Sequence, residues 1–141
     1  MDEIVRAGDL VIACQLIDDL GPFIHREFLL SDERTDEMRV ISHVQYLEWP
    51  DHGAPILASQ FLDYVRHIQR LGSNDDDEIV LVHCSAGIGR TGAFILLDSA
   101  IRLVEAHCPV NPIHLIKMMR DQRPMMLQTS VRILFNKQTF T

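Results

Sequence analysis

The 141-residue chain is short of cysteine and of positive charge. Its three cysteines, Cys14, Cys84 and Cys108, cannot all pair, and their spacing fits neither a disulfide framework nor a Cys-x-x-Cys metal site. Acidic residues outnumber basic ones by 20 to 13, which argues against binding to nucleic acid or through a polybasic membrane patch. We therefore expect reduced thiols, a cytoplasmic setting and no nucleic-acid partner.

Long apolar runs, repeats and low-complexity segments are also missing. The longest apolar stretch near the start, Leu10 to Ala13, is far too short to cross a bilayer, and the residues before it do not form a basic signal region. Hydrophobic residues nevertheless make up 47% of the chain, enough for one compact core. We expect residues 1–141 to form a single domain without a membrane span.

The first third of the chain predicts strands and turns. Apolar residues at Leu10 to Ala13 and at Phe23 and Ile24 lie on either side of the breaker Gly21-Pro22, and residues 39–47 alternate in polarity. Farther along, Ile79 to Val82 is apolar and β-branched, which is typical of a strand buried on both faces. Together these segments predict a twisted mixed sheet.

Helical spacing dominates the remainder. We expect one helix with Ser59 as its N-cap, a second that is buried from Ala93 to Val104, and a third with Pro112 in its first turn. Ile113, Ile116 and Met119 should face inward on the third helix, and a last helix should begin near Thr129. The fold class is therefore α/β, with helices flanking the sheet.

The residues that carry chemistry are concentrated in one glycine-rich loop. Residues 83–92 read HCSAGIGRTG and lie between the predicted buried strand and the second helix. The glycines let the backbone turn inward, so that amides can surround an anion at the positive end of a helix dipole. In this setting Cys84 is expected to be a thiolate, with Arg90 as a planar phosphate clamp and Thr91 donating its hydroxyl to the sulfur.

Two plainer interpretations compete with this one. A cysteine after a buried strand is often an inert core residue, and glycine-rich turns open many nucleotide-binding helices. No lysine follows the glycines, as a nucleotide-binding P-loop would require. His83 lies beside Cys84 but lacks partners at metal-ligand spacing, so we expect no metal and expect His83 to orient the loop backbone.

The ten-residue string resembles the signature of the protein tyrosine phosphatase family, especially its tyrosine-specific non-receptor members. The resemblance implies a phosphotyrosine-phosphatase-like fold and hydrolysis of phosphotyrosine in proteins through a phosphocysteine intermediate, without a cofactor. It implies that the substrate is bound by Asp51, Gln128 and the loop residues Cys84, Ser85, Ala86, Gly87, Ile88, Gly89 and Arg90. A noncatalytic module that only binds phosphotyrosine is the alternative.

Two further segments extend the resemblance. Residues 49–55, WPDHGAP, are similar to the mobile acid loop of the family, with Asp51 as the general acid that protonates the departing tyrosine. Without the resemblance, Asp51 would be interpreted as a turn carboxylate. Gln128 matches the glutamine that holds the attacking water, while Arg120 and Arg123 are expected to be structural and to pair with carboxylates or carbonyls near the loop.

The resemblance extends from about Leu10 to Gln128 and lacks the upstream part of the usual domain. Three residues depart from the family pattern: Met125 where glycine is common, Arg132 where a second glutamine is usual, and Ile133 where an aromatic residue often follows. A domain without its upstream strands is expected to leave a sheet edge or an apolar face open to solvent.

Overall fold

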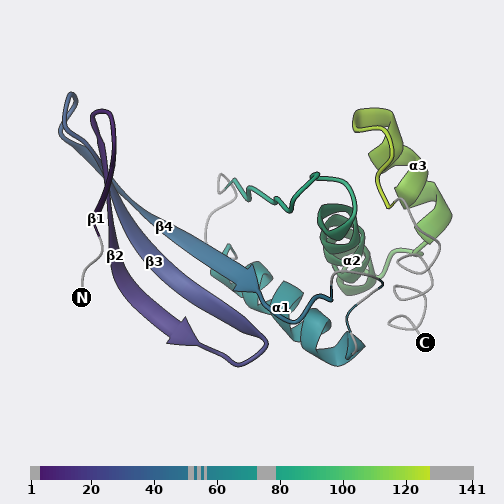
Figure 1. Cartoon of the computed structure of the whole chain (residues 1–141). Helices are drawn as coiled ribbons and strands as arrows, with labels where there is room; N and C mark the ends of the chain where they lie inside the picture. The colour runs from purple at the N-terminus through teal and green to yellow at the C-terminus, as the bar shows by residue number, and fades with distance from the viewer. Residues whose placement is uncertain (1–3, 51–52, 54, 56, 73–78, 128–141) are drawn as a thin grey trace. The chain divides into compact units, whose positions relative to one another are not determined.

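The computed structural model describes residues 4–50, 53, 55, 57–72 and 79–127. The chain divides into two compact units, residues 1–48 and residues 49–141. The first unit holds the strands and the second holds the helices (Figure 1). In the parts of the chain that are described, no helix has both the length and the apolar character needed to cross a membrane.

The first unit is a four-stranded antiparallel sheet in the order β1-β2-β3-β4, as Figure 1 shows. Its strands are β1 (Ile4–Ala7), β2 (Leu10–Asp19), β3 (Phe23–Asp32) and β4 (Glu37–Tyr46). The turn between β2 and β3 uses Gly21 at φ +83°, a conformation that favours glycine. A register shift between Cys14 and Leu16 marks a bulge in β2. The predicted strands are confirmed, and β1 is an additional one that the pattern did not indicate.

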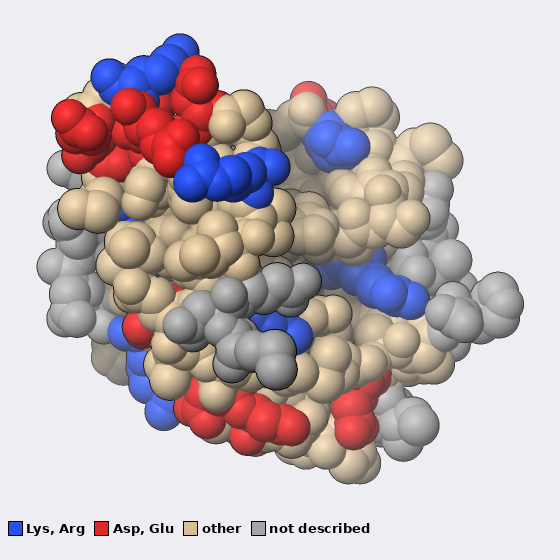
Figure 2. Space-filling view, turned by 60° about the vertical axis from the view of Figure 1, so that its left-hand side comes forward, with Lys and Arg blue, Asp and Glu red and all other residues tan. Residues whose placement is uncertain are grey.

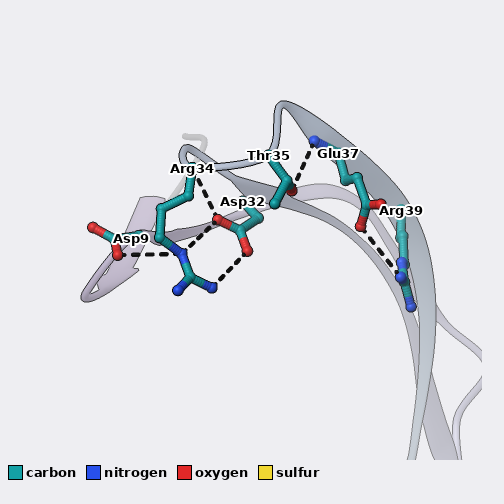
Figure 3. Close-up of polar contacts among 6 residues, drawn as sticks. All are labelled: Asp9, Asp32, Arg34, Thr35, Glu37 and Arg39. Atoms are coloured by element: carbon teal, nitrogen blue, oxygen red, sulfur yellow. Dashed lines mark hydrogen bonds and ion pairs between the residues drawn. The ribbon is translucent and has the colours of Figure 1, made fainter.

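The turns at one end of this sheet are shaped by ion pairs. Arg34 donates to Asp32 at 3.1 Å and approaches Asp9 at 3.4 Å, and Arg39 approaches Glu37 at 3.4 Å (Figure 3). The hydrogen bond from the Arg34 side chain is the main reason that the pKa of Asp32 is lowered. Acidic and basic side chains gather together on the surface (Figure 2). Exposed pairs of this kind contribute little to stability.

The second unit contains three helices, α1 (Ala58–Leu71), α2 (Arg90–Glu105) and α3 (Pro112–Gln122). Helix α2 contacts both of the others, and eight of its 16 residues are buried. Among the described residues, the largest fully buried side chains are all in this unit: Phe61, Val65, Leu96, Leu97 and Leu127. The burial predicted for the second helix is therefore confirmed in part, since Val104 near its end is exposed.

The helix ends differ in part from the sequence-based expectation. Helix α1 begins at Ala58 with Leu57 in the N-cap position and no side-chain cap, so Ser59 lies inside the helix. In α3 the side chain of Asn111 caps the helix by accepting from the backbone N–H of His114, and Pro112 occupies the first turn as expected. Ile116 is buried, but Ile113 is exposed.

The combination of a sheet and helices confirms the predicted α/β class, but the predicted strand at Ile79 to Val82 is wrong. The sheet is antiparallel throughout and does not include this segment, which forms no regular secondary structure and has no strand partner among the described residues. Ile79 and Leu81 are 95% and 87% exposed. A strand buried on both faces needs neighbours on both sides, and local apolar character cannot supply them. The helix expected near Thr129 lies outside the described residues.

Candidate active site

The glycine-rich loop leads from the exposed segment at residues 79–82 into the N-terminus of α2. Gly89 occupies the N-cap position of α2 and Arg90 is the first residue of the helix. Gly87 has φ +68°, which turns the loop inward at a cost that only glycine avoids. Cys84 is half-buried at the start of the loop. The thiol therefore lies near free backbone N–H groups at the positive end of a buried helix.

The environment of Cys84 favours its thiolate. Partial burial raises the pKa of the thiol, because it removes water from the charged form. Hydrogen bonds outweigh this effect: the side chain and backbone N–H of Thr91 and the backbone N–H groups of Gly87 and Ile88 lower the pKa to about 6. The pKa of Cys84 is thus lowered, as expected from the sequence. At neutral pH a pKa of about 6 leaves most of the thiol ionised.

Thr91 is the side chain with the largest favourable effect on this thiol. It is buried in the first turn of α2, with 5% of its surface exposed. Its hydroxyl has no other hydrogen-bond partner among the described residues, which leaves it available to the sulfur.

The segment that follows α3 is hydrogen-bonded to carbonyl groups of the glycine-rich loop. The backbone N–H of Leu127 donates to the Ile88 carbonyl at 3.0 Å, and Nη2 of Arg123 donates to the Ala86 carbonyl at 3.3 Å. Arg120 in turn donates to the carbonyls of Met126 at 2.9 Å and Leu127 at 3.1 Å. The predicted structural pairing of both arginines with carbonyls near the loop is confirmed.

Arg90 connects the loop with the segment that precedes Asp51. Its Nη2 donates to the Pro50 carbonyl at 3.3 Å, and its guanidinium carbon lies 6.0 Å from the centre of the Trp49 ring. Trp49 is itself held edge-on against Phe61, with ring centroids 5.1 Å apart. The contacts of Trp49 with Arg90 and Phe61 were not predicted from the sequence. The only indication in the sequence is that Trp49 directly precedes Pro50 and Asp51.

The predicted site residues fall into two groups. Cys84, Arg90 and Thr91 lie together at the loop and the start of α2. Asp51 and Gln128 lie outside the described residues, as do Arg132 and Ile133. Their neighbours in the chain are held in place: Pro50 is hydrogen-bonded to Arg90 of α2, and Leu127 is hydrogen-bonded to Ile88 of the loop.

The expectation about His83 is wrong. His83 is exposed and makes no hydrogen bond with any other residue that the structure describes, so it does not orient the loop. Of the other two thiols, Cys14 is half-buried and Cys108 is exposed.

A cavity of about 450 Å³ opens beside the thiol. Cys84, Gly87 and Thr91 form one wall, and apolar side chains such as Met119 and Met126 form another. His83 and Arg123 are the ionisable groups that join Cys84 in the lining. Chemically, the arrangement offers a sulfur anion beside backbone N–H groups, which suits attack on a phosphorus that carries negatively charged oxygens.

Comparison with known proteins identifies the family. The profile described as protein-tyrosine phosphatase matches residues 1–140. The chain is 40% identical over 128 residues to tyrosine-protein phosphatase non-receptor type 4 of Homo sapiens, a match that covers 91% of this chain and 14% of that protein. It is 41% identical over 128 residues to tyrosine-protein phosphatase 1 of Caenorhabditis elegans, covering 91% of this chain and 12% of that protein. It is 35% identical over 128 residues to the Lar-like tyrosine-protein phosphatase of the same organism, covering 91% and 6%.

The relatives are much longer than this chain, which spans at most 14% of their length. The family match nevertheless includes the glycine-rich loop, α2 and the segment after α3, because it extends over residues 1–140. The chain belongs to the protein-tyrosine phosphatase family.

Proposed function

We propose that this chain hydrolyses phosphotyrosine in proteins or peptides through a phosphocysteine intermediate. In the first step the Cys84 thiolate forms a bond to phosphorus while the bond to the tyrosine oxygen breaks, and Asp51 gives its proton to that oxygen. In the second step water attacks phosphorus, Asp51 accepts the proton, and the sulfur leaves as inorganic phosphate is released. Tyrosine needs the proton because its hydroxyl has a pKa of about 10.

The remaining residues of the site act on charge and position. The backbone N–H groups of residues 85–90 and the fork of Arg90 bind the phosphate oxygens, and they bind more strongly as charge accumulates there in the transition state. Thr91 stabilises the sulfur as it leaves, and Gln128 orients the attacking water. No metal is part of the proposal, because the amides and the guanidinium supply the positive field.

The pKa of about 6 at Cys84 is the observation that supports this function best. A module that only bound phosphate would gain nothing from a sulfur anion in the loop, because that anion repels the ligand. A nucleophile, in contrast, must be ionised to react. The thiolate therefore favours the enzyme over the noncatalytic binding module.

The segments on either side of the loop support the roles of the two residues outside the described ranges. Arg90 holds the carbonyl of Pro50, which immediately precedes Asp51, and Ile88 accepts from Leu127, which immediately precedes Gln128. Both chain neighbours are therefore tied to the phosphate loop or to the clamp. A cytoplasmic setting belongs to the same proposal, since reducing conditions keep Cys84 free to react.

The test is hydrolysis of para-nitrophenyl phosphate and of a phosphotyrosine peptide by the purified chain. We expect Cys84→Ser to abolish turnover of both. Asp51→Ala should slow the peptide by about 10²- to 10⁴-fold, and the nitrophenyl ester less, because nitrophenolate leaves more readily without a proton.

Asp63→Asn is the matched control, since Asp63 is an exposed carboxylate on α1 and does not line the cavity beside the thiol. It should leave both rates unchanged. Turnover by the unaltered chain no faster than by Cys84→Ser would refute the proposed function. Phosphopeptide binding without turnover would then favour the binding module.

A further inference from the structure

We propose that Arg123 is a positioning residue that fixes the peptide between Ala86 and Gly87, so that the N–H of Gly87 points toward the sulfur of Cys84. Arg123 comes directly after α3, from a part of the sequence 37 residues away from Ala86. It would act on the nucleophile without touching the substrate. The inference rests on the proposed function, because it assigns a cause to the reactivity of Cys84.

A peptide unit is planar, so its carbonyl and its N–H are held in fixed directions relative to one another. The carbonyl of Ala86 and the N–H of Gly87 belong to the same peptide and point in opposite directions. Nη2 of Arg123 donates to that carbonyl at 3.3 Å, and the N–H of Gly87 is one of the backbone groups that lower the pKa of Cys84. A partner that holds the carbonyl on the outer side of the loop therefore also holds the N–H on the inner side. The positive charge further polarises the peptide toward the sulfur.

Two neighbouring carbonyls of the loop, those of Ile88 and Gly89, also accept hydrogen bonds. The carbonyl of Ile88 accepts from the backbone N–H of Leu127 at 3.0 Å, and that of Gly89 accepts within α2 from the N–H of Ala93 at 3.1 Å. These two contacts use backbone groups, which any residue would supply. The Ala86 carbonyl instead relies on one side chain, so this contact can be removed by substitution.

Gly87 and Arg123 also fit one another in space. A Cβ atom built on Gly87 would lie 3.1 Å from Nη2 of Arg123, and the residue has φ +68°. The glycine thus allows both the inward turn of the backbone and the approach of the guanidinium. The sequence places these two residues far apart, and their fit is apparent only in the folded unit.

A test of Arg123 has to distinguish its effect on the thiol from the effects of other charged groups nearby. Among the described residues, His83 and Arg123 line the cavity beside Cys84, and Arg90 begins α2 at the end of the loop. His83 and Arg123 both adjoin the thiol, so the reaction of the sulfur itself has to be followed.

The experiment measures the pH dependence of alkylation of Cys84 by iodoacetamide, resolved from Cys14 and Cys108 by mass spectrometry of peptides. The variants are Arg123→Met, which removes the donor and the charge, and Arg123→Lys, which removes Nη2 but keeps the charge. Both should raise the midpoint from about 6, with a fall of about twofold or more in the alkylation rate at pH 6. Lys117→Met, an exposed charge on α3, is the control and should leave the midpoint in place.

An unchanged midpoint in folded Arg123→Met and Arg123→Lys would overturn the inference. An equal shift in Lys117→Met, or a shift in Arg123→Met but not in Arg123→Lys, would also overturn it, because charge alone would then be responsible. If Arg123→Met does not fold, Arg123→Lys decides the question. Alkylation needs no turnover, so a chain that shows the shift but no hydrolysis would refute the proposed function and retain this inference.

Discussion

Cys84 is subject to two opposing influences, and their balance decides what the residue can do. Partial burial alone would raise the pKa of its thiol and make it an inert cysteine of the kind common after buried segments. Thr91 and the amides of Gly87 and Ile88 reverse that outcome. The sequence predicted the reversal because glycines and a helix start follow Cys84 directly, so the donors are local in the chain.

The lowered pKa of Cys84 has a consequence for stability. The folded chain releases the thiol proton at about pH 6, whereas the unfolded chain keeps it until its ordinary pKa of 9.0. Between these values the unfolded state binds more protons, so this group contributes stability that is fully present above pH 9 and is lost as the pH falls toward 6. We expect the melting temperature of the unaltered chain, relative to that of Cys84→Ser, to rise from pH 6 to pH 9.

Comparison with Cys84→Ser is needed because other ionisable side chains, including seven histidines, also contribute to the pH dependence of stability. Their contribution cancels in the difference between the two melting curves. A difference that stays constant or shrinks as the pH rises would contradict the lowered pKa.

At the scale of elements, the close approach of α2 to the segment after α3 organises the site. Gly92 is buried in the first turn of α2, and a Cβ atom there would lie 3.0 Å from the backbone nitrogen of Leu127. That nitrogen is the donor to the Ile88 carbonyl. Absence of a side chain at position 92 therefore allows the loop and its support to meet.

Gly92→Ala should destabilise the chain, although alanine is favoured over glycine within a helix by about 1 kcal/mol. The added methyl group meets backbone rather than a flexible side chain, so Leu127 must move away from Ile88. Such overpacking costs about 1–3 kcal/mol, which outweighs the gain in helix propensity. Urea unfolding followed by circular dichroism measures the change.

Ser99→Ala, also on α2, is the matched control for helix propensity. It should leave the free energy of unfolding within about 0.5 kcal/mol of the original value. If Gly92→Ala instead increased the free energy of unfolding, the segment after α3 would be able to move away from α2 without destabilising the chain.

At the scale of the whole molecule, apolar side chains divide sharply between a buried helical core and exposed segments. Leu96 and Leu97 of α2 are completely buried, whereas Ile79 and Leu81 are almost completely exposed. Exposed, extended and apolar segments are prone to pair with other chains. Such a segment lies directly before the glycine-rich loop.

Replacing Ile79 and Leu81 together by threonine should reduce aggregation and leave the free energy of unfolding within about 0.5 kcal/mol, because neither side chain is packed. Light scattering during concentration and urea unfolding provide the two measurements. Leu97→Ala is the contrasting variant and should cost about 2–5 kcal/mol. A comparable loss in the double threonine variant would show that the segment is buried in solution.

Local patterns were sufficient for the strands β2 to β4 and for the buried helix α2, because alternation, breakers and helical spacing act over a few residues. They failed for the segment at residues 79–82, since burial on two faces depends on neighbours distant in the chain. They also misassigned Ser59 as a cap and His83 as a loop partner, because many side chains can make such bonds and only geometry selects the one that does.

The sequence by itself determined the local setting of the proposed nucleophile and of its proposed clamp, because Cys84, Arg90 and the glycines lie within one short loop at a helix start. Only the tertiary structure decided what supports that loop. The contacts of Arg123 with Ala86, of Leu127 with Ile88 and of Arg90 with Pro50 join residues 37 to 40 positions apart, and hydrogen bonds across such separations depend on how the helices pack.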